Sequence, residues 1–342
     1  MDTFVPGINI SAKDYVIEYV ANLLFKHKGE FKLYKIINFI AALVHLTNGI
    51  LSIALASDSG RNISFPVQRT FVGWDTCNSS IVPKNTSYGF GEFIITPAST
   101  EQGFTVNLLG LIVSFHMLSF FFQMSVYVTD YSELITERGV NFLRFIEYSI
   151  SASIMLICIA FISNIVLLPS LVGLFVLSFA TMVLGGIAEA LFDDILVGDE
   201  LSGDDTYLKL RRIGWVAHLT GWVTLTAAYG VMIFDNFGLS VGKSNVAVPG
   251  FVTFIVIGIF CFYMVFGVIQ LCQLCFKDPG MGSLCGLYRP PKEFQVYGMN
   301  PNEFVELLYV FNSLTTKTIL GWVIISNLLS DEQMSGGPLP TC

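Results

Sequence analysis

A lysine and a glutamate occur deep inside two long apolar stretches of the chain. Lys317 interrupts the neutral run 312–318, and Glu147 follows Arg144 by three residues near the start of an earlier stretch. An ionised side chain at the centre of a membrane-spanning helix costs about 2.5–3.5 kcal/mol on insertion scales, so each residue calls for a partner. We therefore expect Lys317 and Glu147 to face each other inside a helical bundle.

A lysine buried among apolar side chains can form a covalent bond with an aldehyde. Desolvation disfavours its ammonium form and leaves a neutral amine, which attacks the carbonyl carbon to give a Schiff base. Retinal is an aldehyde, and its Schiff base keeps a proton only if an anion lies nearby, a role that Glu147 can fill. The alternative is that Lys317 and Glu147 form a purely structural ion pair.

Two serines share helix faces with these charges. Ser151 follows Glu147 by four residues and Ser313 precedes Lys317 by four, so each hydroxyl can hydrogen-bond the neighbouring charge. The alternative for both serines is bonding to the backbone carbonyl one turn back.

Three histidines also lie in apolar stretches. His45 and His116 can accept a proton from the buried site, directly or through water, although a packing role is the alternative for each. His218, near the start of its stretch, is expected to face the membrane interface.

The stretches that position these residues are long enough to cross a bilayer. The 342 residues are 53% apolar and 13% charged, with a mean hydropathy of +0.66. A spanning helix needs about 20 apolar residues. Seven such stretches occur, at 33–57, 104–128, 143–164, 167–191, 212–235, 249–276 and 303–329. We predict an all-α membrane protein with seven transmembrane helices. The third and fourth stretches nearly merge, and only Asn164 and Pro169 separate them.

The distribution of positive charge predicts the orientation of the chain. Lysine and arginine are retained on the cytoplasmic side, and most of the 18 fall on the side that carries the N-terminus. Three glycosylation acceptor triplets, beginning at Asn62, Asn78 and Asn85, fall on the other side. We expect the N-terminus to be cytoplasmic and the C-terminus extracellular. The first stretch starts too late and runs too long for a cleavable signal peptide, so we expect it to be retained.

This orientation divides the chain into three parts. Residues 1–32 are expected to form a cytoplasmic segment, 33–329 the seven-helix domain, and 330–342 an extracellular tail. The extracellular loop 58–103 contains two alternating segments, 62–67 and 90–95, that predict short strands and a small β-hairpin.

Several functional classes have little support. The formal net charge of −8 offers no basic surface for nucleic acid. Cys272 and Cys275 have a spacing typical of zinc ligands, but no second ligand pair follows, so no metal site is expected. No phosphate-binding loop or nucleophile motif indicates an enzyme.

Three motifs resemble those of the heliorhodopsins, retinal proteins distant from other microbial rhodopsins. The first is Arg144-x-x-Glu147-Tyr148-Ser149-x-Ser151-x-Ser153-x-Met155. The others are the segment 246–252 and Ser313-x-x-x-Lys317. The resemblance covers about residues 33–329 and implies a rhodopsin-like bundle with an inside N-terminus.

The resemblance also implies residue roles. Lys317 would carry all-trans retinal, Glu147 would be its counterion, and Ser151 and Ser313 would be hydrogen-bonding neighbours. His45 and His116 would belong to a buried polar network on the cytoplasmic side. The retinal channel would be lined by residues of the third to sixth spans, namely Met155, Met182, Trp222, Phe262 and Phe266, with lipid-facing or packing positions as the alternative for the aromatics. The sheet of the first loop would form a homodimer contact.

The expected function is slow light sensing. Light would isomerise retinal to 13-cis and lower the proton affinity of its nitrogen beside Glu147. Ser313 stands where ordinary microbial pumps carry an aspartate, which disfavours outward pumping. The sequence does not indicate a downstream signalling partner.

Two alternatives stay open. One is a light-activated proton or cation conductor with Glu189, Asp193 and Asp194 at its cytoplasmic mouth. The other is a retinal-free transporter that uses Lys317 and Glu147 as an alternating ion pair.

Overall fold

A computed structural model of the chain describes residues 33–59, 64–71, 74–76, 89–90, 93–95, 99–129, 131, 135, 139–192, 205–234, 250–278 and 301–330. Several predictions concern residues outside this set. They are the N-terminal segment 1–32, the tail beyond 330, the three acceptor asparagines, the residues 246–249, and the pair Asp193 and Asp194.

The described residues contain seven helices that are long and apolar enough to cross a membrane. They are α2 (Leu33–Ser59), α3 (Leu108–Val128), α4 (Phe142–Ile162), α5 (Leu168–Ala190), α6 (Asp205–Ile233), α7 (Gly250–Lys277) and α9 (Pro301–Ser330). The prediction of a seven-helix bundle is therefore confirmed. Large apolar side chains remain exposed on its outer surface, such as Phe121, Val223 and Phe311, as expected for contact with lipid.

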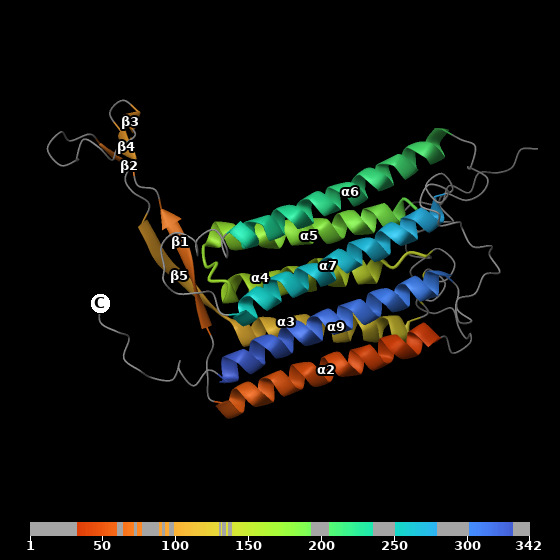
Figure 1. Cartoon of the computed structure of the whole chain (residues 1–342), viewed down its shortest axis with the longest axis horizontal. Coiled ribbons are helices and arrows are strands. Elements are labelled where there is room, and N and C mark those ends of the chain that lie inside the picture. The colour runs from red at the N-terminus through yellow and green to blue at the C-terminus, as the bar shows by residue number, and fades with distance from the viewer. Residues whose placement is uncertain are drawn as a thin grey trace, which may run out of the picture.

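The helices lie side by side with their axes nearly aligned (Figure 1). Successive helices pack from α2 to α6, and α9 packs against α2 and α7. The strands gather at the end where α3 begins and α4 ends, which we call the sheet end. The far end is the one where α4 and α9 begin.

Two helix starts differ from the prediction by four residues or more, and every other boundary lies within two residues of it. α3 begins at Leu108 and not at 104, because the Asn107 side chain accepts a hydrogen bond from the Gly110 backbone N–H at 2.9 Å and caps the helix. α6 begins at Asp205, seven residues before the predicted start. This longer α6 moves His218 towards the middle of the helix.

The turn between α4 and α5 matches the expected punctuation. Asn164 adopts a left-handed conformation with φ 61°, and Pro169 lies in the first turn of α5. Asparagine tolerates this conformation, and proline fits a helix start, so the two helices separate over five residues.

The first loop forms two small antiparallel sheets. β1 (Ser64–Phe71) pairs with β5 (Ser99–Asn107). In the second sheet, β4 (Phe93–Ile95) lies between β2 (Trp74–Thr76) and β3 (Gly89–Phe90). The predicted hairpin is confirmed, although the partner of β1 is β5, and the predicted strand 90–95 is divided between β3 and β4.

The longer sheet contacts the bundle at the turn between α4 and α5. The Gln68 backbone N–H donates to the Val166 carbonyl at 2.9 Å, and the ring of Phe65 stacks on Phe161 with centroids 5.3 Å apart. Val67 is buried beside them. These contacts fix the sheet against the end of α4.

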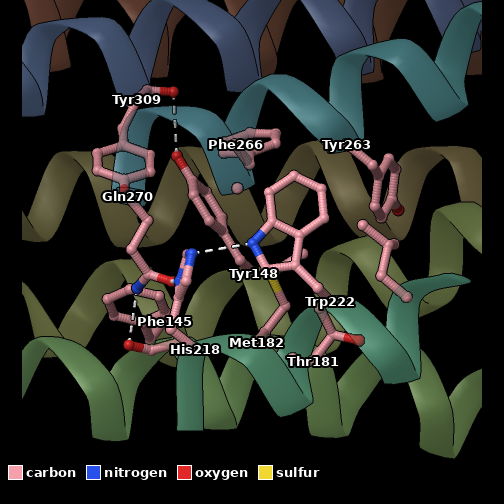
Figure 2. Close-up of a pocket in the computed structure, with 14 residues that line it drawn as sticks. Phe145, Tyr148, Thr181, Met182, His218, Trp222, Tyr263, Phe266, Gln270 and Tyr309 are labelled. Atoms are coloured by element: carbon pink, nitrogen blue, oxygen red, sulfur yellow. Dashed lines mark hydrogen bonds between the residues drawn. The ribbon is translucent and has the colours of Figure 1, made fainter. Parts of the chain in front are cut away.

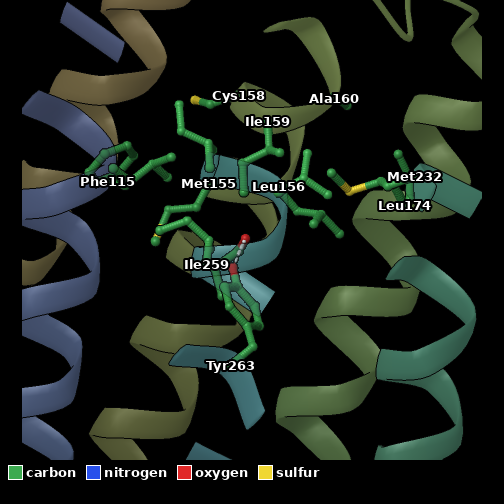
Figure 3. Packing of buried hydrophobic residues seen from close by; sticks show 14 of the residues in the cluster. Phe115, Met155, Leu156, Cys158, Ile159, Ala160, Leu174, Met232, Ile259 and Tyr263 are labelled. Atoms are coloured by element: carbon green, nitrogen blue, oxygen red, sulfur yellow. Dashed lines mark hydrogen bonds between the residues drawn. The ribbon is translucent and has the colours of Figure 1, made fainter. Parts of the chain in front are cut away.

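The apolar core fills much of the bundle between the sheet end and its middle. Figure 3 shows Leu156 and Ile159 of α4 packed with Leu174, Met232 and Ile259 from three other helices. All five side chains are at most 2% exposed. The core therefore forms a dry region on the sheet side of the α4 glutamate.

Candidate functional site

Lys317 and Glu147 form a buried ion pair between α9 and α4. The Lys317 Nζ contacts Glu147 Oε1, and both side chains are only 3% exposed. Helical side chains tilt towards the helix N-terminus, so Lys317 extends towards the far end and reaches the carboxylate near the start of α4. The two residues singled out by their cost in an apolar helix are therefore partners.

Ser119 of α3 joins this pair. Lys317 Nζ donates to the Ser119 hydroxyl oxygen at 2.6 Å, and the same hydroxyl lies 2.6 Å from Glu147 Oε1. Sequence reasoning missed Ser119. The available signal was its position three residues after His116, on the same face of one helix.

The two predicted serines occupy different positions around the pair. The Ser151 hydroxyl lies 3.5 Å from Glu147 Oε1, a long contact on the expected side of the carboxylate. The Ser313 hydroxyl is buried one turn from Lys317 and makes no hydrogen bond of normal geometry to any described residue. This hydroxyl lies where it can hydrogen-bond a group attached to the lysine.

His45 and His116 contact each other between α2 and α3, with their Nδ1 atoms 3.0 Å apart. Gly321, one turn beyond Lys317 towards the sheet end, lies against His116. This places the pair near the middle of the bundle, on the sheet side of Lys317, because α3 begins at the sheet end and His116 precedes Ser119. The assignment of the pair to a cytoplasmic network depends on the orientation of the chain and stays a prediction.

An apolar cavity begins at Lys317 and continues between α5, α6 and α7. Its inner part is lined by Ser313 and Lys317 of α9 and by Ser151 and Met155 of α4. Its outer part is lined mainly by apolar and aromatic side chains, such as Met182, Leu225 and Tyr263, as is usual for a small-molecule site. The two parts share four wall residues, namely Tyr148, Met182, Tyr263 and Phe266.

The outer part ends at a group of polar side chains, shown in Figure 2. The Trp222 indole N–H donates to His218 Nε2 at 2.9 Å, and His218 Nδ1 lies 2.9 Å from Gln270 Oε1. His218 is therefore buried in the cavity wall and not at the membrane interface, because α6 starts earlier than predicted. A side chain at Gly267 would collide with the Trp222 ring, so this glycine allows the close approach.

Most of the predicted lining residues belong to this cavity, but one does not. Met155, Met182, Trp222 and Phe266 line it, whereas Phe262 does not. Tyr263 takes that place, because Tyr263 and Phe266 share a helix face at a spacing of three residues. Phe262 packs at the edge of the apolar core.

Glu189 lies in a separate charged cluster towards the far end. The Arg144 guanidinium binds Glu189 Oε2 at 2.5 Å and also contacts the carboxylate of Glu306. Glu189 is thus apart from His45 and His116, since it approaches from the end of α5 and they lie on α2 and α3. Glu306 was missed because it lies in the polar first turns of α9.

The residues around Lys317 fit retinal. The cavity offers a buried amine, an unbonded hydroxyl at Ser313 and an elongated apolar wall. Gly185 and Gly267 keep the wall open, because a Cβ at either position would meet an aromatic ring within 3 Å. A seven-helix membrane bundle with a lysine, a carboxylate and this cavity at its centre defines the class of retinal-type rhodopsins.

Comparisons with known proteins specify the family. The family model Heliorhodopsin matches residues 34–281, so the chain belongs to the heliorhodopsin family. α9, which carries Lys317, lies beyond the matched residues. The chain is a light-responsive rhodopsin of the retinal type and an integral, multi-pass membrane protein.

Comparisons with solved structures and with curated proteins do not specify the function further. One solved structure to which the chain is similar is described as the crystal structure of a light-driven proton pump from Leptosphaeria maculans. The identity is 9% and the TM-score 0.42, with 90% of this chain and 98% of that chain covered. Comparison with curated proteins gives no match.

Proposed function

We propose that the chain is a slow light sensor that carries all-trans retinal on Lys317 as a protonated Schiff base, with Glu147 as the counterion. The observation that carries this proposal is the buried Lys317–Glu147 pair at the inner end of an apolar cavity. A structural ion pair alone does not require such a cavity beside the amine.

Retinal, when bound, supplies the light-driven isomerisation from all-trans to 13-cis. Glu147 stabilises positive charge on the Lys317 nitrogen, and Ser119 orients the carboxylate by donating to it. Met155, Met182, Tyr263 and Phe266 exclude water from the chain of the ligand, which strengthens the electrostatic interaction at its end.

The α9 turn next to Lys317 supports sensing and not outward pumping. Ser313 lies there, and a hydroxyl cannot hold the negative charge that an aspartate would provide at this position. Light-activated proton or cation conduction is the second candidate, and the buried carboxylates Glu189 and Glu306 favour it.

The orientation and assembly belong to the same proposal. The charge distribution supports a cytoplasmic far end and an extracellular sheet end. The side chain of Phe104 on β5 is exposed, which supports a homodimer contact through this sheet.

The visible spectrum of the protein expressed with all-trans retinal tests the proposal. We expect a visible band that Lys317→Ala abolishes and Glu147→Gln shifts to longer wavelength, because the counterion no longer stabilises the positive nitrogen. Lys277→Ala is the matched control, since Lys277 is a buried lysine that lines neither part of the apolar cavity, and it should keep the band. A protein that stays colourless would contradict the proposal and favour the ion-pair transporter.

A further inference from the structure

A second, polar cavity lies on the other side of Glu147 from the apolar one. It is small, and its polar wall includes Asn38, Gln123, Asn141, Arg144, Glu147 and Glu306. Glu147 therefore stands between two different surroundings. One is the apolar cavity that begins at Lys317, and the other leads towards the far end of the bundle.

Gln123 indicates that the polar cavity holds hydrogen-bonding groups beyond those of the protein. Its side chain is 4% exposed, and its Oε1 atom has no hydrogen-bond partner in the described part of the chain. A buried amide oxygen requires a donor, and a single water molecule in this polar cavity can supply it. Glu147 and Glu306 line the same cavity, so such a water lies where it can link the two carboxylates.

Glu306 lies where the polar cavity meets the charged cluster. Its Oε1 accepts from the Asn141 side chain at 2.6 Å, and its Oε2 contacts Arg144. Glu189 accepts from the Asn141 backbone N–H at 2.9 Å and binds Arg144 with its other oxygen. Glu306 lines both this cavity and the next one towards the far end, whereas Glu189 lines only the latter.

Two carboxylates share one guanidinium in this cluster. All four carboxylate oxygens face N–H donors, which favours the charged form of both groups. The other groups that face the cluster are Tyr148, Tyr309 and Gln273, and Lys277 binds the Gly139 carbonyl at its edge. A proton added to Glu306 would leave the pair of Arg144 and Glu189 balanced.

We infer that Glu306 is the acceptor of the proton that leaves the Lys317 nitrogen after illumination, with Glu147 as the relay. In the first transfer the N–H bond at Lys317 breaks and an O–H bond forms on Glu147. In the second, Glu147 releases its proton to water and Glu306 gains one, so Glu147 returns to its anionic form. This inference rests on the proposed function, because without bound retinal no proton leaves Lys317.

Light-induced infrared difference spectra test the inference. We expect the wild type to gain a carboxylic acid carbonyl band that shifts in D2O and is lost in Glu306→Gln. Glu303→Gln, one turn earlier on the same helix, should keep the band. Loss of the band in both variants or in neither would overturn the assignment.

A second measurement does not need the chromophore. In the retinal-free protein at neutral pH, Glu306→Gln should remove an ionised carboxylate band and no carbonyl band. Removal of a carbonyl band would show that Glu306 already carries a proton and would overturn the inference. If Glu306→Gln does not fold, Glu306→Asp should move the light-induced band to a new frequency, and an unmoved band would overturn the assignment.

The two levels of failure can be told apart. A colourless wild type contradicts the proposed function itself. A coloured protein whose light-induced carbonyl band does not depend on Glu306 contradicts only the proton acceptor.

Discussion

Both halves of α4 contain deeply buried side chains, but the chemistry of those side chains differs. Towards the far end, Arg144 and Glu147 are 5% and 2% exposed, and towards the sheet end Leu156 and Ile159 are fully buried. The first half binds carboxylates, a lysine and serines, and the second packs against aliphatic side chains. Burial alone therefore does not mark the functional region. The difference indicates that a charge released at Lys317 has polar surroundings mainly on one side.

Removal of the central cation should have the largest effect. Arg144→Leu leaves Glu189 and Glu306 buried without their shared partner, which should cost about 3–5 kcal/mol of folding stability. Thermal unfolding in detergent measures the loss, and the exposed Arg212→Leu should change stability by less than about 0.5 kcal/mol. A small effect of Arg144→Leu would show that the carboxylates are neutral, and the contrast between the halves would fail.

Truncation in the apolar half should cost stability and leave the chromophore unchanged. Leu156→Ala removes a fully buried side chain from the core, at about 2–5 kcal/mol, but Leu156 does not line the apolar cavity. Thermal unfolding and the visible spectrum, measured on one sample, check both parts. A shifted band would mean that the core and the retinal site are mechanically coupled.

Features that depend only on the composition of one helix could be predicted from the sequence. Seven apolar runs and the isolated charges Lys317 and Glu147 are local signals whose physical cost can be judged residue by residue. Features that depend on helix rotation were out of reach. Ser119, Gln123 and Glu306 acquire their roles only when α3, α4 and α9 face one another, and a serine or glutamine in an apolar helix is otherwise unremarkable.

The burial of Arg144 and His218 also could not be predicted from the sequence. Arg144 lies in the first turn of α4, yet it is buried because two glutamates from distant helices converge on it. His218 was assigned to the interface because the start of α6 was placed seven residues late.

Substitution of Ser119, which lies on α3 beside Glu147 of α4, should affect both stability and the visible band. Ser119→Ala removes hydrogen bonds to both Lys317 and Glu147, each a charged group, at about 1.5–3 kcal/mol. We expect lower stability and a shifted visible band. Ser125→Ala on the same helix loses only a bond to its own backbone and should do neither.

The smallest expected effect is at the outer end of the apolar cavity. Trp222→Phe removes the hydrogen bond to His218, at about 0.5–1.5 kcal/mol, and should shift the visible band slightly. Trp215→Phe also loses an indole hydrogen bond, in this case to the Asp278 carboxylate, but Trp215 does not line the cavity, so the band should stay in place. Equal shifts in both variants would argue against contact between Trp222 and the ligand.

Covalent trapping tests the central claim most directly. The coloured protein would be reduced with borohydride, digested, and analysed by mass spectrometry for a peptide that carries a retinyl group. We predict the modification on Lys317 and on no other lysine, and its loss in Lys317→Ala. An unmodified Lys317, or a retinyl group on another lysine such as Lys277, would contradict the account.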